Sequence, residues 1–195
     1  LLIAVLVLSS FFAAEATESS SFMGWCQSYE NGTMSPSQAR TMYSVMARVY
    51  FRRSSERSDF ENRRLSSCGA TRERLADKYS LNLYESRISD LTPLESLVEF
   101  KQLKELRLDN NGLRSVEGLG QLTQLEVLRL DENSIHDISP LASLVNLRDL
   151  DLSESHVSDF TPLSSMVSLE RLNLSYVGIT DVAPVVEALK NLPNL

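Results

Sequence analysis

Leucine residues recur with a period of 22 residues from residue 103 onward, and this period constrains the fold more than any other feature of the chain. Each copy opens with the pattern L-x-x-L-x-L, and the copies begin at Leu103, Leu125, Leu147 and Leu169. An apolar residue follows five positions later, and then three more at three-residue spacing, such as Ile138, Leu141 and Leu144. Chance would place apolar residues at all of these positions with a probability on the order of 10⁻¹⁰.

The repeat extends beyond these four copies in both directions. Residues 81–100 form an earlier copy in register with the others. Lys78 stands where the first leucine of this copy is expected, and a three-residue insertion precedes Leu103. A divergent first copy is expected where a stack of repeats meets a cap. Leu192 and Leu195 reproduce the first leucines of a further copy. Because the sequence opens on Leu1 and stops within that copy, we expect both ends to be truncated.

Each copy predicts a short strand followed by an irregular helical turn. The L-x-L segment places its leucines on one face of a strand and the intervening residue on the other. The three-residue spacing that follows suits a 3₁₀ turn, in which side chains at i and i+3 lie above one another. A single unit cannot bury its own apolar face, so successive units must stack into a curved parallel sheet with one continuous core. The expected fold class is therefore α/β, a solenoid.

The sequence of residues 125–146 fits the pattern L-x-x-L-x-L-x-x-N-x-I-x-D-I-x-P-L-x-x-L-x-x almost completely. This pattern resembles the 22-residue class of leucine-rich repeat found in bacterial internalins, and the resemblance covers about residues 78–195. It implies a leucine-rich repeat solenoid with a helical N-terminal cap and an asparagine ladder that hydrogen-bonds neighbouring backbone groups. Proteins with this architecture do not share one ligand, so the resemblance is much less specific for function.

Several copies depart from the pattern. The ladder asparagine is present as Asn111 and Asn133 and is replaced in the remaining copies by Ser86, Ser155 and Val177. We therefore expect the ladder to be broken, most clearly at Val177. One aspartate precedes the helical turn in four copies, namely Asp90, Asp137, Asp159 and Asp181, whereas Ser115 and Gly118 replace Asp and Pro in the copy that begins at Leu103. These aspartates are interpreted as turn or capping residues. A calcium site is the weaker alternative, because the carboxylates are spread one per copy.

The first sixteen residues predict a signal peptide that is not part of the fold. An apolar run is followed by Ala14-Glu15-Ala16, which matches an A-x-A cleavage site and would make Thr17 the first mature residue. A membrane-spanning helix is the competing interpretation, but the run is about 14 residues long where roughly 20 are needed. We therefore expect the protein to be exported, to the periplasm, the cell surface or the medium, without stable membrane insertion after cleavage.

Residues 17–77 lack the period and predict a helical cap. Ser35 followed by Pro36 and Gln38 is typical of a helix start, with Ser35 as N-cap. Apolar residues then follow at helical spacing on one face: Ala39, Met42, Tyr43, Met46, Val49 and Tyr50. Two further helices are expected around residues 59–65 and 71–79. Arginines are frequent in this segment, but the absence of interleaved aromatic residues favours a solvated surface over a nucleic-acid site.

Cys26 and Cys68 are the two cysteines of the chain. In an exported protein an isolated pair most often forms a disulfide, and two free thiols are the main alternative. No C-x-x-C motif is present, and His136 and His156 have no ligand-like spacing, so we expect no metal site. No cofactor is expected either.

The strand residues between the leucines form columns on the face expected to be concave, which is the usual binding surface of solenoids. The candidate ligand-binding residues are Asn82, Tyr84, Glu105, Arg107, Asp109, Arg129, Asp131, Asp149, Asp151, Ser153, Arg171, Asn173 and Tyr176. We expect Arg107 and Arg129 to be central anchors and Tyr84 and Tyr176 to be edge contacts. Solubility and pairing between strands are the alternative explanation for each charge.

These features predict a non-catalytic module that binds a protein or peptide, for example one with a basic patch. The net charge of −7 argues against nucleic acid as the main partner. Catalysis has little support, because no nucleophile–histidine pair or glycine-rich phosphate loop is evident, and the acidic residues repeat with the period of the scaffold. The alternative function is a targeting or substrate-recognition region of a larger secreted enzyme or adhesin, with its active domain beyond Leu195. The sequence indicates no particular oligomeric state.

Overall fold

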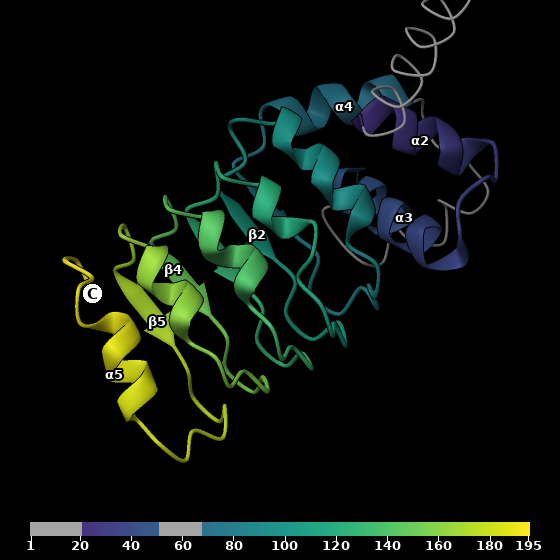
Figure 1. The fold of residues 1–195 in the computed structure, drawn as a ribbon. Coiled ribbons are helices and arrows are strands. Elements are labelled where there is room, and N and C mark those ends of the chain that lie inside the picture. Colours follow the sequence, from purple (N-terminus) through teal and green to yellow (C-terminus); the bar gives the residue numbers. More distant parts are fainter. Residues whose placement is uncertain (1–20, 51–67) are drawn as a thin grey trace, which may run out of the picture.

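The computed structural model describes residues 21–50 and 68–195 (Figure 1). The predicted signal peptide, its cleavage site and the helix expected around residues 59–65 lie outside the described residues.

Five three-residue strands form one parallel sheet in the order of the sequence (Figure 1). They are β1 (Ser80–Asn82), β2 (Glu105–Arg107), β3 (Val127–Arg129), β4 (Asp149–Asp151) and β5 (Arg171–Asn173). The register aligns the middle leucine of every strand, so that Leu106 lies between Leu81 and Leu128. The sheet and its stacked copies confirm the predicted leucine-rich repeat solenoid.

The opposite side of each of the first four copies is a 3₁₀ turn, as the three-residue spacing predicts. These turns are η2 (Thr92–Glu99), η3 (Leu119–Gln121), η4 (Ser139–Ser143) and η5 (Thr161–Ser165). The last copy differs, because α5 (Ala183–Leu189) is an α-helix that packs beside η5 (Figure 1). The expectation of a 3₁₀ turn was wrong there. From Leu169 to Leu192 this copy has one residue more than the 22-residue period, and the longer segment accommodates i to i+4 hydrogen bonds such as that from Lys190 N to Val186 O.

The aspartates that precede the helical turns act as the sequence predicts. A carboxylate oxygen accepts a hydrogen bond from the amide two residues later at each of them: Asp90 from Thr92, Asp137 from Ser139, Asp159 from Thr161 and Asp181 from Ala183, at 2.8–3.0 Å. The carboxylate satisfies an amide that has no partner within the turn. These aspartates therefore have a structural function.

The copy without this aspartate and proline turns by means of glycine. Gly118 adopts a φ of +89° at the start of η3, a conformation that glycine reaches without steric cost. Gly120 lies against the next copy, where a Cβ atom would come within 2.4 Å of the carbonyl oxygen of Pro140. A side chain at residue 120 would therefore push η3 and η4 apart.

Two ladder asparagines join three successive copies through buried hydrogen bonds. Asn133 Oδ1 accepts from the amides of Asn111 and Leu113, while Nδ2 donates to the carbonyls of Leu108, Leu130 and Asp131. Asn111 makes the equivalent contacts with the copy before it. The ladder ends there, since the buried hydroxyl of Ser155 has no hydrogen-bond partner within the described residues. Val177, in the next copy, has no side-chain acceptor at all.

The N-terminal helices cover the β1 end of the solenoid. They are α2 (Phe22–Glu30), α3 (Pro36–Tyr50) and α4 (Cys68–Ala76). The predicted start of α3 is confirmed, because Ser35 Oγ accepts from the Gln38 amide and Gln38 Oε1 accepts from the Ser35 amide. Helix α2 was not predicted, and α4 begins and ends three residues earlier than expected.

The cap packs onto the first repeat through apolar and polar contacts. The Phe22 ring meets the edge of the Phe100 ring with centroids 5.4 Å apart, and the Phe22 amide donates to Glu99 Oε1. Thr41 Oγ1 donates to the carbonyl of Asp90 at 2.7 Å. Met42, Met46 and the leucines of the solenoid belong to one buried cluster. The cap thus completes the hydrophobic core at the end of the stack.

Cys26 of α2 and Cys68 of α4 are brought together by this packing. Their Cα atoms are 5.7 Å apart, the sulfur atoms lie at bonding distance, and both side chains are buried. None of the described helices is long and apolar enough to cross a membrane.

Replacement of a ladder asparagine should cost much of the stability of the solenoid. We expect Asn133→Ser to lower the free energy of unfolding by about 3 kcal/mol, because several buried backbone groups lose their partner. Chemical denaturation followed by circular dichroism measures the change. The control is Asn146→Ser, which removes one exposed hydrogen bond to Thr123 and should change stability by less than about 0.5 kcal/mol. Equal effects of the two substitutions would contradict the ladder's importance.

Candidate binding face

The strand side chains that point away from the leucine core form the open face of the sheet. Its first column comprises Ser80, Glu105, Val127, Asp149 and Arg171, and its second comprises Asn82, Arg107, Arg129, Asp151 and Asn173. The residues that follow each strand add Tyr84, Asp109, Asp131, Ser153 and Ser175, and then Glu85, Asn110, Glu132, Glu154 and Tyr176. We refer to these residues together as the open face. The 22-residue period thus aligns the candidate binding residues in these columns, but Asp109 and Asp149 are buried and not exposed at the surface.

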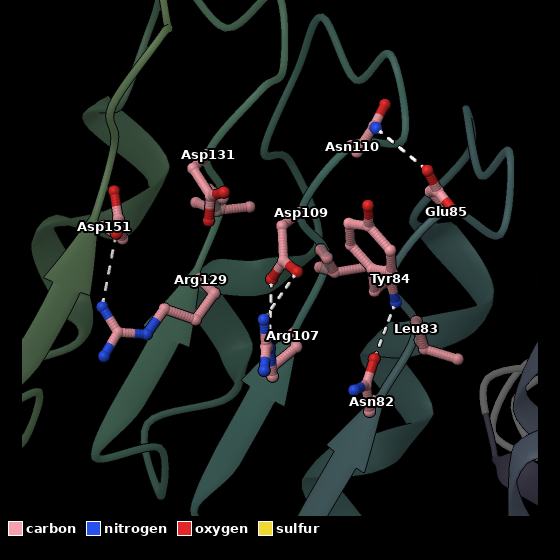
Figure 2. A network of polar contacts seen from close by, with 12 residues as sticks. Asn82, Leu83, Tyr84, Glu85, Arg107, Asp109, Asn110, Arg129, Asp131 and Asp151 are labelled. Carbon is pink, nitrogen blue, oxygen red and sulfur yellow. Dashed lines mark hydrogen bonds and ion pairs between the residues drawn. The ribbon is translucent and has the colours of Figure 1, made fainter. Parts of the chain in front are cut away.

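Arg107 is fixed by the carboxylate two residues later. Its Nε and Nη2 atoms donate to the two oxygens of Asp109 at 3.3 and 3.0 Å (Figure 2). The Asp109 side chain is 1% exposed, whereas that of Arg107 is 42% exposed. The hydrogen bonds to Asp109 raise the pKa of Arg107. The guanidinium is thus held in one orientation at the surface, with its charge offset by Asp109.

Arg129 pairs with carboxylates of the next strand. Its two terminal nitrogens contact Asp149 at 2.9 Å and Asp151 at 3.4 Å, the latter drawn in Figure 2. Asp149, which is buried, also accepts from Arg171 Nε at 2.8 Å, and Asp151 accepts from the amide group of Asn173 at 3.1 Å. The candidate residues of β3, β4 and β5 therefore form one connected network.

Asp131 stands apart from these pairs. Its side chain lies between the Arg107 and Arg129 pairs in Figure 2, and no cation lies within 4.0 Å of it among residues 21–50 and 68–195. Partial burial and the charges of Asp109 and Asp151 raise the pKa of Asp131. The open face thus carries, near its centre, a carboxylate without a direct ion-pair partner among the described residues, although Arg107 is close enough to feel its charge.

Further unpaired carboxylates lie at the carboxyl edge of the strands. Glu132 and Glu154 are exposed and make no side-chain hydrogen bond or ion pair with any described residue, while Glu85 interacts with Asn110 at 3.4 Å and with the hydroxyl of Tyr84. All of these glutamates have φ values of 50–55°. This left-handed conformation recurs in every copy, and it presents the side chains in a row along the edge.

The two tyrosines lie at opposite ends of the open face. Tyr84 follows β1 and is 37% exposed, and its carbonyl accepts from Arg48 of the cap. Tyr176 follows β5 and is 87% exposed. The structure does not bring them together, so they can serve only as separate contacts.

Two groups resemble metal sites at first sight. Ligand atoms of Cys26, Glu30 and Cys68 lie within 4.8 Å of one another, but the two sulfurs are joined and offer no thiolate. His136 and His156 stack with ring centroids 5.1 Å apart. This pair was not predicted, although the spacing of 20 residues, close to the period, was a signal that the two histidines lie in adjacent copies.

Comparisons with known proteins agree with this geometry. A family model described as leucine-rich repeats in two copies matches residues 101–142 and 123–165. The crystal structure of an internalin (inlF) from Listeria monocytogenes matches with a TM-score of 0.59 and 26% sequence identity, over 78% of this chain and 41% of that one. Internalin C2 (inlC2) from the same organism matches with a TM-score of 0.51 and 32% identity, over 63% of this chain and 61% of that one. A search of curated protein sequences gave no match.

The chain carries a leucine-rich repeat domain whose structural neighbours include these two internalins. It spans about two fifths and three fifths of the lengths of the two internalins. Leucine-rich repeat domains commonly bind proteins.

The charges of the leucine-rich repeat domain predict opposite effects of two substitutions. Asp131→Asn should stabilise the protein at neutral pH by about 0.5 kcal/mol, a value reduced for solvent screening, because the raised pKa of Asp131 means that its charged form opposes folding. The gain should shrink as the pH falls through that raised pKa and vanish below the unfolded-state value of 3.8.

Asp159→Ala is the comparison variant. The hydroxyl and amide of Thr161 lower the pKa of Asp159, so its charged form favours folding above the unfolded-state value. The substitution should destabilise at neutral pH, and the loss should vanish as the pH falls through the lowered pKa. Urea unfolding at several pH values measures both effects. Destabilisation by Asp131→Asn at pH 7 would contradict the electrostatic assignment.

Proposed function

We propose that this chain is a non-catalytic module that binds a basic protein or peptide on its open face. The observation that supports this proposal is the asymmetry of pairing there: Arg107, Arg129 and Arg171 are all paired with aspartates, whereas Asp131, Glu132 and Glu154 have no cationic partner among the described residues. A partner with positive charge would supply the missing counter-ions.

Arg107 and Arg129 are central anchors in this proposal. Their guanidinium groups are partly exposed and held by carboxylates, so little side-chain entropy is lost when a partner packs on them. Tyr84 and Tyr176 provide apolar contact area at the two ends. The acidic side chains select a basic partner, and the anchored arginines contribute flat surfaces on which it packs.

A random-peptide display selection on the immobilised chain tests the proposal. We expect selected peptides to be enriched in Lys and Arg and to bind with one-to-one stoichiometry. The double variant Asp131→Asn, Glu132→Gln should weaken their binding about fivefold or more, and Arg107→Ala with Arg129→Ala about tenfold. Fluorescence polarisation gives the affinities, and circular dichroism checks that each variant is folded.

The matched control is Glu117→Gln with Glu187→Gln, which removes two exposed acidic charges on the helical side of the solenoid. It should leave the affinity within about twofold, because solvent-exposed charges far from the contact are screened. Selected peptides without basic residues, or equal losses in the control and the face variants, would refute the assignment.

We further propose that the protein is a bacterial exported protein. The apolar run that ends at Ala14-Glu15-Ala16, the isolated cysteine pair and the likeness to internalins support this proposal together. A disulfide persists in an oxidising compartment and not in a reducing cytosol.

The cysteine pair gives a separate prediction. Cys26 and Cys68 are separated by 42 positions and join α2 to α4, so the bond restricts a long loop in the unfolded chain. Cys26→Ala with Cys68→Ala should lower the free energy of unfolding by roughly 4 kcal/mol. Alkylation of the exported protein without prior reduction, followed by mass spectrometry, should leave both cysteines unmodified. Alkylation of both after denaturation would refute the bond.

A further inference from the structure

A hollow lies at the carboxyl edge of the sheet between the copies that contain β4 and β5. It has a volume of about 480 Å³ and is lined by Glu154, Ser155, His156, Tyr176, Val177 and Gly178. Gly178 occupies the repeat position that His156 occupies one copy earlier, and a Cβ atom there would meet nothing within 4 Å. Residue 178 therefore contributes no side chain to the lining of the hollow, and the space beside it is open.

Three side chains around the hollow are equipped for recognition. They are the Glu154 carboxylate, the His156 imidazole and the Tyr176 ring, and none of their polar atoms has a hydrogen bond or ion pair with another described residue. His156 makes one ring contact, a stack on His136 with an interplanar angle of 14°. In contrast, the arginines of the open face are all paired. Unpaired polar groups thus gather beside this hollow.

We propose that the hollow binds the guanidinium group of an arginine side chain from a protein partner. A planar cation can stack on the rings of His156 and Tyr176 while its N–H groups donate to the Glu154 carboxylate. A lysine ammonium can pair with Glu154, but it lacks the flat surface for stacking. This inference rests on the proposed function, since it specifies one side chain of the basic partner and the place where it binds.

The same residues disfavour other occupants. The Glu154 carboxylate repels an anion, and the unpaired Glu132 one copy earlier adds to the negative field. A metal ion is disfavoured because His136 and His156 belong to no group of three close ligand residues in the described parts of the chain. The arrangement of two rings and one carboxylate fits a planar cation best.

Proton NMR of the full chain tests the proposal, with the peptides Ac-Gly-Arg-Gly-NH2 and Ac-Gly-Lys-Gly-NH2 as probes. The chain has two histidines, so substitution of each one assigns the ring C–H signals. Titration at neutral pH with the arginine peptide should shift the His156 signals, with a dissociation constant of about 5 mM for a ligand of this size. The lysine peptide should bind His156 at least about threefold more weakly, because it loses the stacking.

Glu154→Gln and Tyr176→Ala should each weaken the arginine titration about threefold or more. The matched control is Glu117→Gln, which removes an exposed carboxylate that does not line the hollow and should leave the titration unchanged. The proposal is overturned if the His156 signals have not shifted when the peptide concentration reaches about 50 mM, which is ten times the expected dissociation constant. It is also overturned if both peptides bind equally or if the two glutamate variants behave alike. Peptide selection on the open face can still succeed in that case, so the two proposals fail separately.

Discussion

Burial of the strand leucines between neighbouring copies is the interaction on which the rest of the structure depends. Leu106, Leu128 and Leu150 are fully buried only because another copy lies on each side. No single copy has enough apolar surface to fold alone, so stability is shared between neighbours along the stack. The same stacking fixes the register of the sheet, and the register fixes which polar residues become neighbours on the open face.

The period therefore made much of the fold and of the open face predictable. Once the 22-residue spacing was known, Arg129 had to lie beside Arg107 and Asp151, and the aspartates before the turns had to meet amides two residues on. Residues outside the repeat were less predictable. Helix α2 has a weak sequence signal, with no acidic residue in its first turn and a glycine within it, and it is held by contacts of Phe22 with Phe100 and Glu99. Long-range packing of this kind leaves no local pattern in the sequence.

Side-chain pairing on the open face could not be predicted from the register alone. The register places Arg107 beside Asn82 and Arg129, but the rotamers decide that it pairs with Asp109 of its own copy. Arg129 instead reaches across to Asp149 and Asp151. These choices leave Asp131 without a direct ion pair. The sequence shows which residues stand in its column, but it does not show which aspartate remains unpaired. An excess of charge at one residue is thus a property of the packed structure and not of the composition.

The ladder and the hollow illustrate how a repeat gains a specific site. In the copies with Asn111 and Asn133, one amide side chain satisfies the backbone of two copies, and the local geometry is dictated by that requirement. Where Ser155 and Val177 replace asparagine, this requirement is lost, and the adjoining positions differ in size between copies, as His156 and Gly178 do. Departures from the consensus weaken the scaffold locally and at the same time distinguish one copy from its neighbours. A uniform stack presents the same chemistry in every copy. Recognition of one particular side chain therefore requires that one copy differ from its neighbours, and the copies differ in this way beside Glu154 and Tyr176.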